Sequence, residues 1–211
     1  MKHRDWNITE GWVGAPRSGK TEAMVKRALE LQRESRCYLI AHDVGWKIPL
    51  QLHDGTHVPL LRHVDEATAR KSIARTSGPA LHAISSDNAE ATLSLCREVA
   101  EASLVRFKDP PPVLLMIDEV VASELADKGQ LNRQLRKLIV ERRHAHVGIL
   151  WGVQHVRFVN NGLVALSTKL HLARMTDEYS ESRLIAAGVQ PEDAEKVKHL
   201  APHQFHACEV S

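Results

Sequence analysis

Eight residues near the amino terminus have the types and the spacing of a phosphate-binding loop. Residues 14–21 read Gly-Ala-Pro-Arg-Ser-Gly-Lys-Thr and fit the pattern G-x-x-x-x-G-K-[S/T] at every position. Glycines let the backbone turn tightly, so consecutive N–H groups can point at phosphate oxygens. In such a loop the lysine reaches the β- and γ-phosphates and the last hydroxyl binds Mg²⁺. The pattern predicts that ATP is bound by Gly14, Ala15, Pro16, Arg17, Ser18, Gly19, Lys20 and Thr21.

An acidic pair follows the most apolar stretch of the chain. Residues 113–117 are Val-Leu-Leu-Met-Ile, a run typical of a central parallel strand that is buried on both faces. Asp118 and Glu119 come next, at the end of the strand where open α/β sheets bind ligands. We expect Asp118 to hold Mg²⁺ through water and Glu119 to act as the general base that polarises the attacking water. A water-activating carboxylate favours ATP hydrolysis over simple nucleotide binding.

Polar residues beside a second apolar run add two candidate roles. The run at 148–153 ends at Gln154, which we expect to contact the γ-phosphate or its water as a sensor. Arg142 and Arg143 precede the run, and an arginine at a helix end can stabilise phosphate charge in a neighbouring subunit. Both arginines remain candidates for that role, which we assign first to Arg143.

Composition narrows the class of protein. The chain has 211 residues, of which 43% are hydrophobic and 26% are charged, as expected for one globular α/β domain covering 1–211. There is no run of eighteen apolar residues and no apolar signal core at the amino terminus, so neither a membrane span nor secretion is predicted. The net charge of +2 gives no global basic field, and any DNA contact must come from local patches.

Cysteine and histidine usage points to no metal centre. The three cysteines, Cys37, Cys96 and Cys208, are far apart and fit a reducing cytoplasm. The pairs His53/His57 and His144/His146 would bind a metal only with partners that the sequence does not identify.

Strand and helix signals alternate along the chain, which predicts a mostly parallel sheet between helices. Residues 43–79 are the least regular part, where 47–52 and 57–61 are predicted to form a hairpin around Asp54-Gly55. Asp87 is predicted to cap the third helix. The apolar residues of the fourth, Leu131, Leu135, Leu138 and Ile139, share one face. The predicted strands are 8–13, 37–41, 81–84, 113–117, 147–153, 169–173 and 204–209, and the predicted helices are 20–34, 65–74, 87–105, 130–143 and 178–187.

The order of these motifs resembles the HerA–FtsK superfamily of DNA-translocating ATPases. The resemblance is carried by the phosphate loop, the Asp-Glu strand and the stretch from Glu141 to Gln154, in which Arg143 stands eleven residues before the glutamine. The segments 170–174, 181–188 and 194–200 are similar to the later strand and closing helices of the family. Because the chain is little more than a motor core, it most resembles the small genome-packaging ATPases of double-stranded DNA viruses with an internal membrane.

This resemblance implies a P-loop NTPase fold of the RecA/FtsK kind, a three-layer α/β sandwich. It also implies a homo-oligomeric ring, with a hexamer favoured, that hydrolyses ATP with Mg²⁺ to translocate double-stranded DNA. Capsid or membrane vertex proteins would be further partners, and the protein would act in the host cytoplasm or at the packaging vertex of the virion. Lys128 and Arg157 are candidates for contacts with DNA in the pore.

Two other classes of protein use the same phosphate loop. One is a small-molecule kinase or nucleotide-dependent switch, although the sequence has no compact arginine-rich lid. The other is an assembly or morphogenesis factor whose bound ATP only stabilises a complex.

Overall fold

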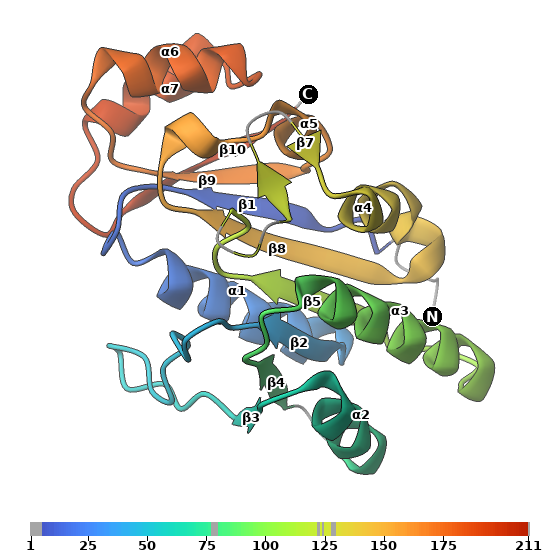
Figure 1. Cartoon of the computed structure of the whole chain (residues 1–211). Helices are drawn as coiled ribbons and strands as arrows, with labels where there is room; N and C mark the ends of the chain where they lie inside the picture. Colours follow the sequence, from blue (N-terminus) through green and yellow to red (C-terminus); the bar gives the residue numbers. More distant parts are fainter. Residues whose placement is uncertain (1–5, 77–79, 122, 124, 128–129, 211) are drawn as a thin grey trace.

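Eight strands form the central sheet of the molecule (Figure 1). The computed structural model describes residues 6–76, 80–121, 123, 125–127 and 130–210, and leaves undescribed the side chains of residues 126, 127, 142 and 143. The strand order is β10-β9-β1-β8-β5-β2-β4-β3, and all neighbours run parallel except β9 and β10. The strands are β1 (Thr9–Val13), β2 (Tyr38–His42), β3 (Leu60–His63), β4 (Leu81–Ile84), β5 (Val113–Ile117), β8 (Val147–Val153), β9 (Lys169–Ala173) and β10 (Phe205–Glu209).

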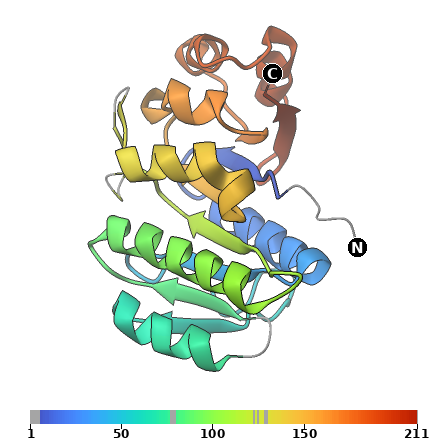
Figure 2. The ribbon, with the colours of Figure 1, turned by 90° about the vertical axis from the view of Figure 1, so that its right-hand side faces the viewer.

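Helices cover both faces of this sheet. The buried side chains of α1 (Lys20–Ser35) pack on one face together with Ile48, Leu52 and Val58. On the other face α2, α3 and α4 follow one another side by side (Figure 2). These and the remaining elements are α2 (Glu66–Arg75), α3 (Ala89–Arg106), α4 (Arg133–Ala145), the 3₁₀ turn η1 (Val156–Phe158), α5 (Asn161–Ala165), α6 (Glu178–Ala186), α7 (Pro191–Lys198) and a short ribbon of β6 (Ala126–Asp127) and β7 (Gln130–Leu131).

The central strands are buried on both faces because both layers of helices need an apolar surface. In β5, Leu114 and Met116 face the α1 layer, whereas Leu115 faces the layer of α3 and α4. Each of these side chains is at most 1% exposed. The predicted mostly parallel three-layer α/β fold is therefore confirmed, and the ranges 81–84, 113–117, 147–153 and 169–173 match observed strands.

The predicted hairpin between 47–52 and 57–61 forms only around its turn. An antiparallel bridge joins Gln51 to His57, and the N–H groups of Leu52 and Val58 donate to the carbonyls of Thr56 and Leu50. Residues 60–63 instead pair in parallel with β4 at the edge of the sheet. Pro49 and Pro59 explain the difference, since neither has an N–H group to donate to a hairpin ladder.

Two helix starts also differ from prediction. The cap of α3 is Asn88 and not Asp87, because the Asn88 side chain accepts the N–H of Ala91. Helix α4 begins at Arg133, where the Asn132 side chain accepts the N–H groups of Gln134 and Leu135, so Leu131 lies in β7 before the helix. Leu135, Leu138 and Ile139 do face the core.

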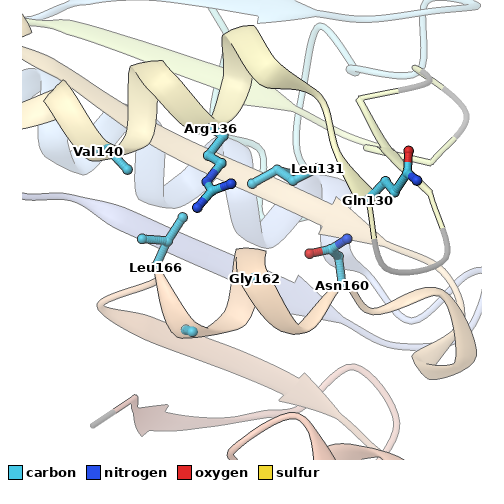
Figure 3. Close-up of a pocket in the computed structure, with 8 residues that line it drawn as sticks. Gln130, Leu131, Arg136, Val140, Asn160, Gly162 and Leu166 are labelled. Atoms are coloured by element: carbon cyan, nitrogen blue, oxygen red, sulfur yellow. The ribbon is translucent and has the colours of Figure 1, made fainter.

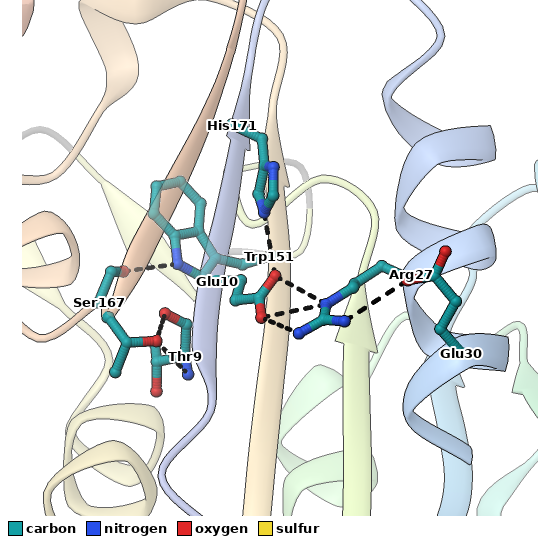
Figure 4. Close-up of polar contacts among 8 residues, drawn as sticks. Thr9, Glu10, Arg27, Glu30, Trp151, Ser167 and His171 are labelled. Carbon is teal, nitrogen blue, oxygen red and sulfur yellow. Dashed lines mark hydrogen bonds and ion pairs between the residues drawn. The ribbon is translucent and has the colours of Figure 1, made fainter. Parts of the chain in front are cut away.

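A buried ion pair joins β1 to α1 and β9 (Figure 4). Glu10 is 4% exposed. Arg27 on α1 donates to both of its carboxylate oxygens, and Nε2 of His171 on β9 lies 3.0 Å from Oε2. Burial alone raises the pKa of Glu10, but the hydrogen bonds with His171 and Arg27 outweigh it and lower the pKa to about 2. The ionised carboxylate therefore fixes the phosphate-loop helix against the strand that precedes it.

We expect Glu10→Gln to destabilise the protein by about 3 kcal/mol at pH 7, because it leaves the Arg27 guanidinium facing a neutral amide. The pKa of Glu10 is depressed in the folded state, so its contribution is complete above about pH 4.5 and is lost as the pH falls towards 2. Urea unfolding of both proteins at pH 7 and pH 3 measures this, and the difference should shrink at pH 3. Glu30→Gln is the matched control, since Glu30 pairs with the same arginine at the surface and should cost about 1 kcal/mol or less. Equal effects of the two substitutions would contradict the prediction.

Candidate functional site

The sheet brings the phosphate loop and the acidic pair to the same edge. Val13 pairs with Val153, and Ile117 pairs with Trp151, so β8 stands between the strand before the loop and the strand before Asp118. All three strands run parallel and therefore end on one side. The segments that follow them meet there, which is the convergence that the two motifs require.

The phosphate loop has the backbone shape that its glycines permit. Gly19 has φ of 89° at the start of α1, and Arg17 has φ of 64°. The loop is held at its start by a hydrogen bond from the N–H of Gly14 to the carbonyl of Val153. The amino terminus of α1, a 16-residue helix, adds the positive end of its dipole.

Lys20 is the cation at the centre of this loop. It is 7% exposed, and its Nζ donates to the carbonyls of Gly14 at 2.8 Å and Ala15 at 2.9 Å. Burial lowers the pKa of Lys20, and the negative charges of Glu119 and Asp118 act against that shift. The ammonium group is thus desolvated and lies within reach of both acidic residues.

The hydroxyl of Thr21 donates to Oδ1 of Asp118 over 2.7 Å, so residues from the two motifs are in direct contact. A hydroxyl and a carboxylate are hard oxygen donors of the kind that Mg²⁺ prefers. The contact therefore fits the metal site that the two motifs predict, with Thr21 and Asp118 as the residues that would hold the ion.

Glu119 has the environment of a general base. It is 9% exposed, and among the described residues its Oε2 has no hydrogen-bond partner. Burial raises its pKa to about 7 and the charge of Asp118 adds to the rise, whereas Lys20, Lys47 and the backbone N–H of Gln154 oppose it. A carboxyl group with a pKa near neutrality can take a proton from water and release it again.

Gln154 reaches the acidic pair through its backbone, which hydrogen-bonds to Glu119. The close approach of the two segments depends on Gly152. A Cβ at this position would lie 2.4 Å from the carbonyl oxygen of Asp118, and the N–H of Val120 donates to the Gly152 carbonyl. The role of the Gln154 side chain as a sensor remains a proposal.

Two residues that the sequence did not single out lie beside the site. Asp43 follows β2, is fully buried, and accepts the N–H groups of Lys47 and Ile48. Its position after the apolar strand at 38–42 was the available signal. The ring of His203 lies near Gly19, 3.3 Å from where a Cβ on that glycine would be. Nothing local in the sequence indicates that proximity.

The remaining predicted residues fall in other places. The side chains of Arg142 and Arg143 and the whole of Lys128 lie outside the described part of the chain. Arg157 is exposed, with its guanidinium 4.5 Å from the centre of the Phe158 ring. Within the described residues no three His, Cys, Asp or Glu side chains gather as a metal site would require. None of the helices described combines the length and apolar composition needed to cross a bilayer.

A pocket of about 570 Å³ lies between α4, β7 and α5, and Leu131, Arg136, Val140 and Leu166 line it (Figure 3). Among the residues described around this pocket, Arg136 is the one charged side chain of the lining. The groups for metal-assisted hydrolysis that the structure describes are collected instead at the phosphate loop.

Comparisons with known proteins agree with the fold. No family model matches the sequence, and no curated protein matches it. The genome packaging NTPase B204 from Sulfolobus turreted icosahedral virus 2, solved with ATP-gammaS, is similar with a TM-score of 0.75 and 15% identity, over 98% of this chain and 94% of that one. The DNA-packaging ATPase B204 from Sulfolobus turreted icosahedral virus is similar with a TM-score of 0.67 and 17% identity, over 97% and 94%.

A longer ATPase chain also shares the architecture. EssC (ATPases 2 and 3) from Geobacillus thermodenitrificans matches 96% of this chain with a TM-score of 0.59 and 13% identity, but only 38% of its own length is covered. The resemblance that the motifs predict is confirmed at the level of the fold.

Proposed function

We propose that this protein is an ATPase that translocates double-stranded DNA, as a viral genome-packaging motor does. The observation that carries the proposal is the contact between Thr21 and Asp118. The carboxyl of Glu119, whose pKa is raised to about 7, is the next residue in the chain. Support comes from the packaging NTPases of similar fold, which cover nearly all of this chain and were solved with ATP analogues. A site that only bound nucleotide would not need Glu119.

Each residue of the site then has one role in ATP hydrolysis. Backbone N–H groups at the amino terminus of α1 and the ammonium of Lys20 bind the phosphates. Thr21 and Asp118 would hold Mg²⁺, which would supply positive charge next to the phosphate oxygens. Glu119 accepts the proton of the attacking water, and the backbone of Gln154 keeps that carboxylate in place. The side chain of Gln154 reports on the γ-phosphate.

We further propose that subunits form a ring, with six the favoured number, and that Arg143 acts on the nucleotide of the neighbouring subunit. In the ring, Lys128 and Arg157 would contact DNA phosphates, an interaction that salt weakens. Capsid or membrane vertex proteins would then hold the ring at the packaging vertex.

The decisive experiment measures ATPase rate with and without duplex DNA over a series of protein concentrations. We expect DNA to stimulate the rate, the rate per subunit to rise with concentration as rings assemble, and Arg143→Ala to lower it to near background. Arg33→Ala is the control, because Arg33 is an exposed arginine in the last turn of α1. Turnover that ignores DNA and needs a small acceptor would indicate a kinase. ATP binding without turnover would indicate an assembly factor.

A further inference from the structure

The loop after β2 approaches the acidic pair from the side opposite to the phosphate loop. His42 pairs with Ile117, so Asp43 and Asp118 are the next residues on two neighbouring parallel strands. The N–H of Asp43 donates to the carbonyl of Ile84, the last residue of β4, which is the other neighbour of β2. This bond continues the sheet one residue beyond the end of β2. Residues 43–48 therefore begin level with the proposed metal ligand.

This loop is held in one shape. The buried carboxylate of Asp43 accepts the N–H of Lys47 at 2.8 Å and that of Ile48 at 3.3 Å. Ile48 is fully buried in the core, and Arg62 donates to its carbonyl at 3.2 Å. The same guanidinium lies 5.4 Å from the centre of the Trp46 ring. The residues on both sides of Lys47 are thus anchored, while its own side chain is exposed.

The charge of Lys47 acts on the catalytic groups. The backbone N–H of Lys47 is hydrogen-bonded to Asp43, the neighbour of Asp118 on the adjacent strand, and its ammonium is close enough for its charge to act on Glu119 and Lys20. Lys20 is buried and already donates to two loop carbonyls, whereas the exposed side chain of Lys47 adds a second cation beside the same groups.

We propose that Lys47 is a second phosphate-binding cation of the site, contributed by the same subunit, which contacts the terminal phosphate as hydrolysis builds charge there. The inference rests on the proposed ATPase function. An ammonium aimed at charge that grows in the transition state raises the rate of hydrolysis more than the affinity for ATP. The proposal also gives a role to residues 43–58. This segment is fixed to α1 by contacts of His53 with Glu22 and of Asp54 with Lys26.

The test compares Lys47→Met and Lys47→Arg with Lys71→Met, an exposed lysine on α2. Single-turnover ATP hydrolysis and equilibrium binding of ATPγS in EDTA are measured for each. We expect Lys47→Met to slow hydrolysis about 10- to 100-fold while changing ATPγS affinity less than about threefold. Lys47→Arg should recover most of the rate, and Lys71→Met should behave as wild type.

A wild-type rate in Lys47→Met, or an affinity loss as large as the rate loss, would overturn the proposal. Rescue of Lys47→Met by mixing with Glu119→Gln protein would place its action in the neighbouring subunit and also overturn it. Absence of turnover in the wild type would overturn the ATPase function itself.

Discussion

Glu119→Gln is expected to bind ATP with wild-type affinity and to hydrolyse it about 10²- to 10⁴-fold more slowly, the usual effect of removing a general base. The substitution keeps the shape of the side chain and an oxygen that can accept the N–H of Gln154. It removes only the ability to take a proton from water. Phosphate release under single-turnover conditions, measured beside ATPγS titration, separates the two effects.

Glu34→Gln is the matched control, because Glu34 is an exposed carboxylate near the end of α1. It should leave both quantities unchanged. Hydrolysis by Glu119→Gln at more than about a tenth of the wild-type rate would show that another group activates the water.

The same carboxylate makes the wild-type rate depend on pH. The pKa of Glu119 is about 7, so the base is increasingly protonated below pH 7 and we expect the rate to fall there. The residual rate of Glu119→Gln should not show this fall below pH 7.

The raised pKa also predicts that this inactive variant is the more stable protein. A carboxyl whose pKa rises from 4.5 to about 7 on folding binds more protons in the folded state, so its ionisation destabilises the fold as the pH rises between those values. At pH 8 the penalty is about 3 kcal/mol. Thermal unfolding of Glu119→Gln without nucleotide should therefore occur at a higher temperature than wild type at pH 8, with the difference disappearing near pH 4.5.

The parts of the site that the sequence predicts are those carried by local patterns. Residues 14–21 combine a glycine-rich turn with a following helix, and Asp118 and Glu119 end an apolar strand. Each pattern is complete within a few residues. That the two would meet follows from the rule that parallel strands place their ligand sites at their carboxyl ends.

The residues that the sequence missed depend on strand order. Asp43 and Lys47 lie near Asp118 only because β2 is the neighbour of β5. His203 reaches Gly19 from the far end of the chain, in the loop before β10. In the sequence, Gly152 is one residue of an apolar strand. The need for glycine there comes from the carbonyl of Asp118, which lies too close to allow a Cβ. The pattern of residues within a single helix or strand does not encode these contacts, because each joins residues that are far apart in the sequence.

Lys20→Ala should abolish ATP binding, with a dissociation constant raised at least about 100-fold. The side chain is almost fully buried, and its ammonium interacts with Asp118 and Glu119 across a desolvated space. Removing it deletes the cation that faces the phosphates and leaves the carbonyls of Gly14 and Ala15 without their donor. Calorimetric titration with ATP in EDTA measures the loss without relying on turnover or metal.

Lys26→Ala tests whether the loss is specific to that position. Lys26 stands on the same helix, where it pairs with Glu22 and Asp54 at the surface, so its removal should change affinity less than about threefold. Tight binding by Lys20→Ala, in a sample whose thermal unfolding matches wild type, would refute the nucleotide site. Comparison with Glu119→Gln then separates ATP binding from hydrolysis. Lys20→Ala should not bind ATP, whereas Glu119→Gln should bind ATP without hydrolysing it at an appreciable rate.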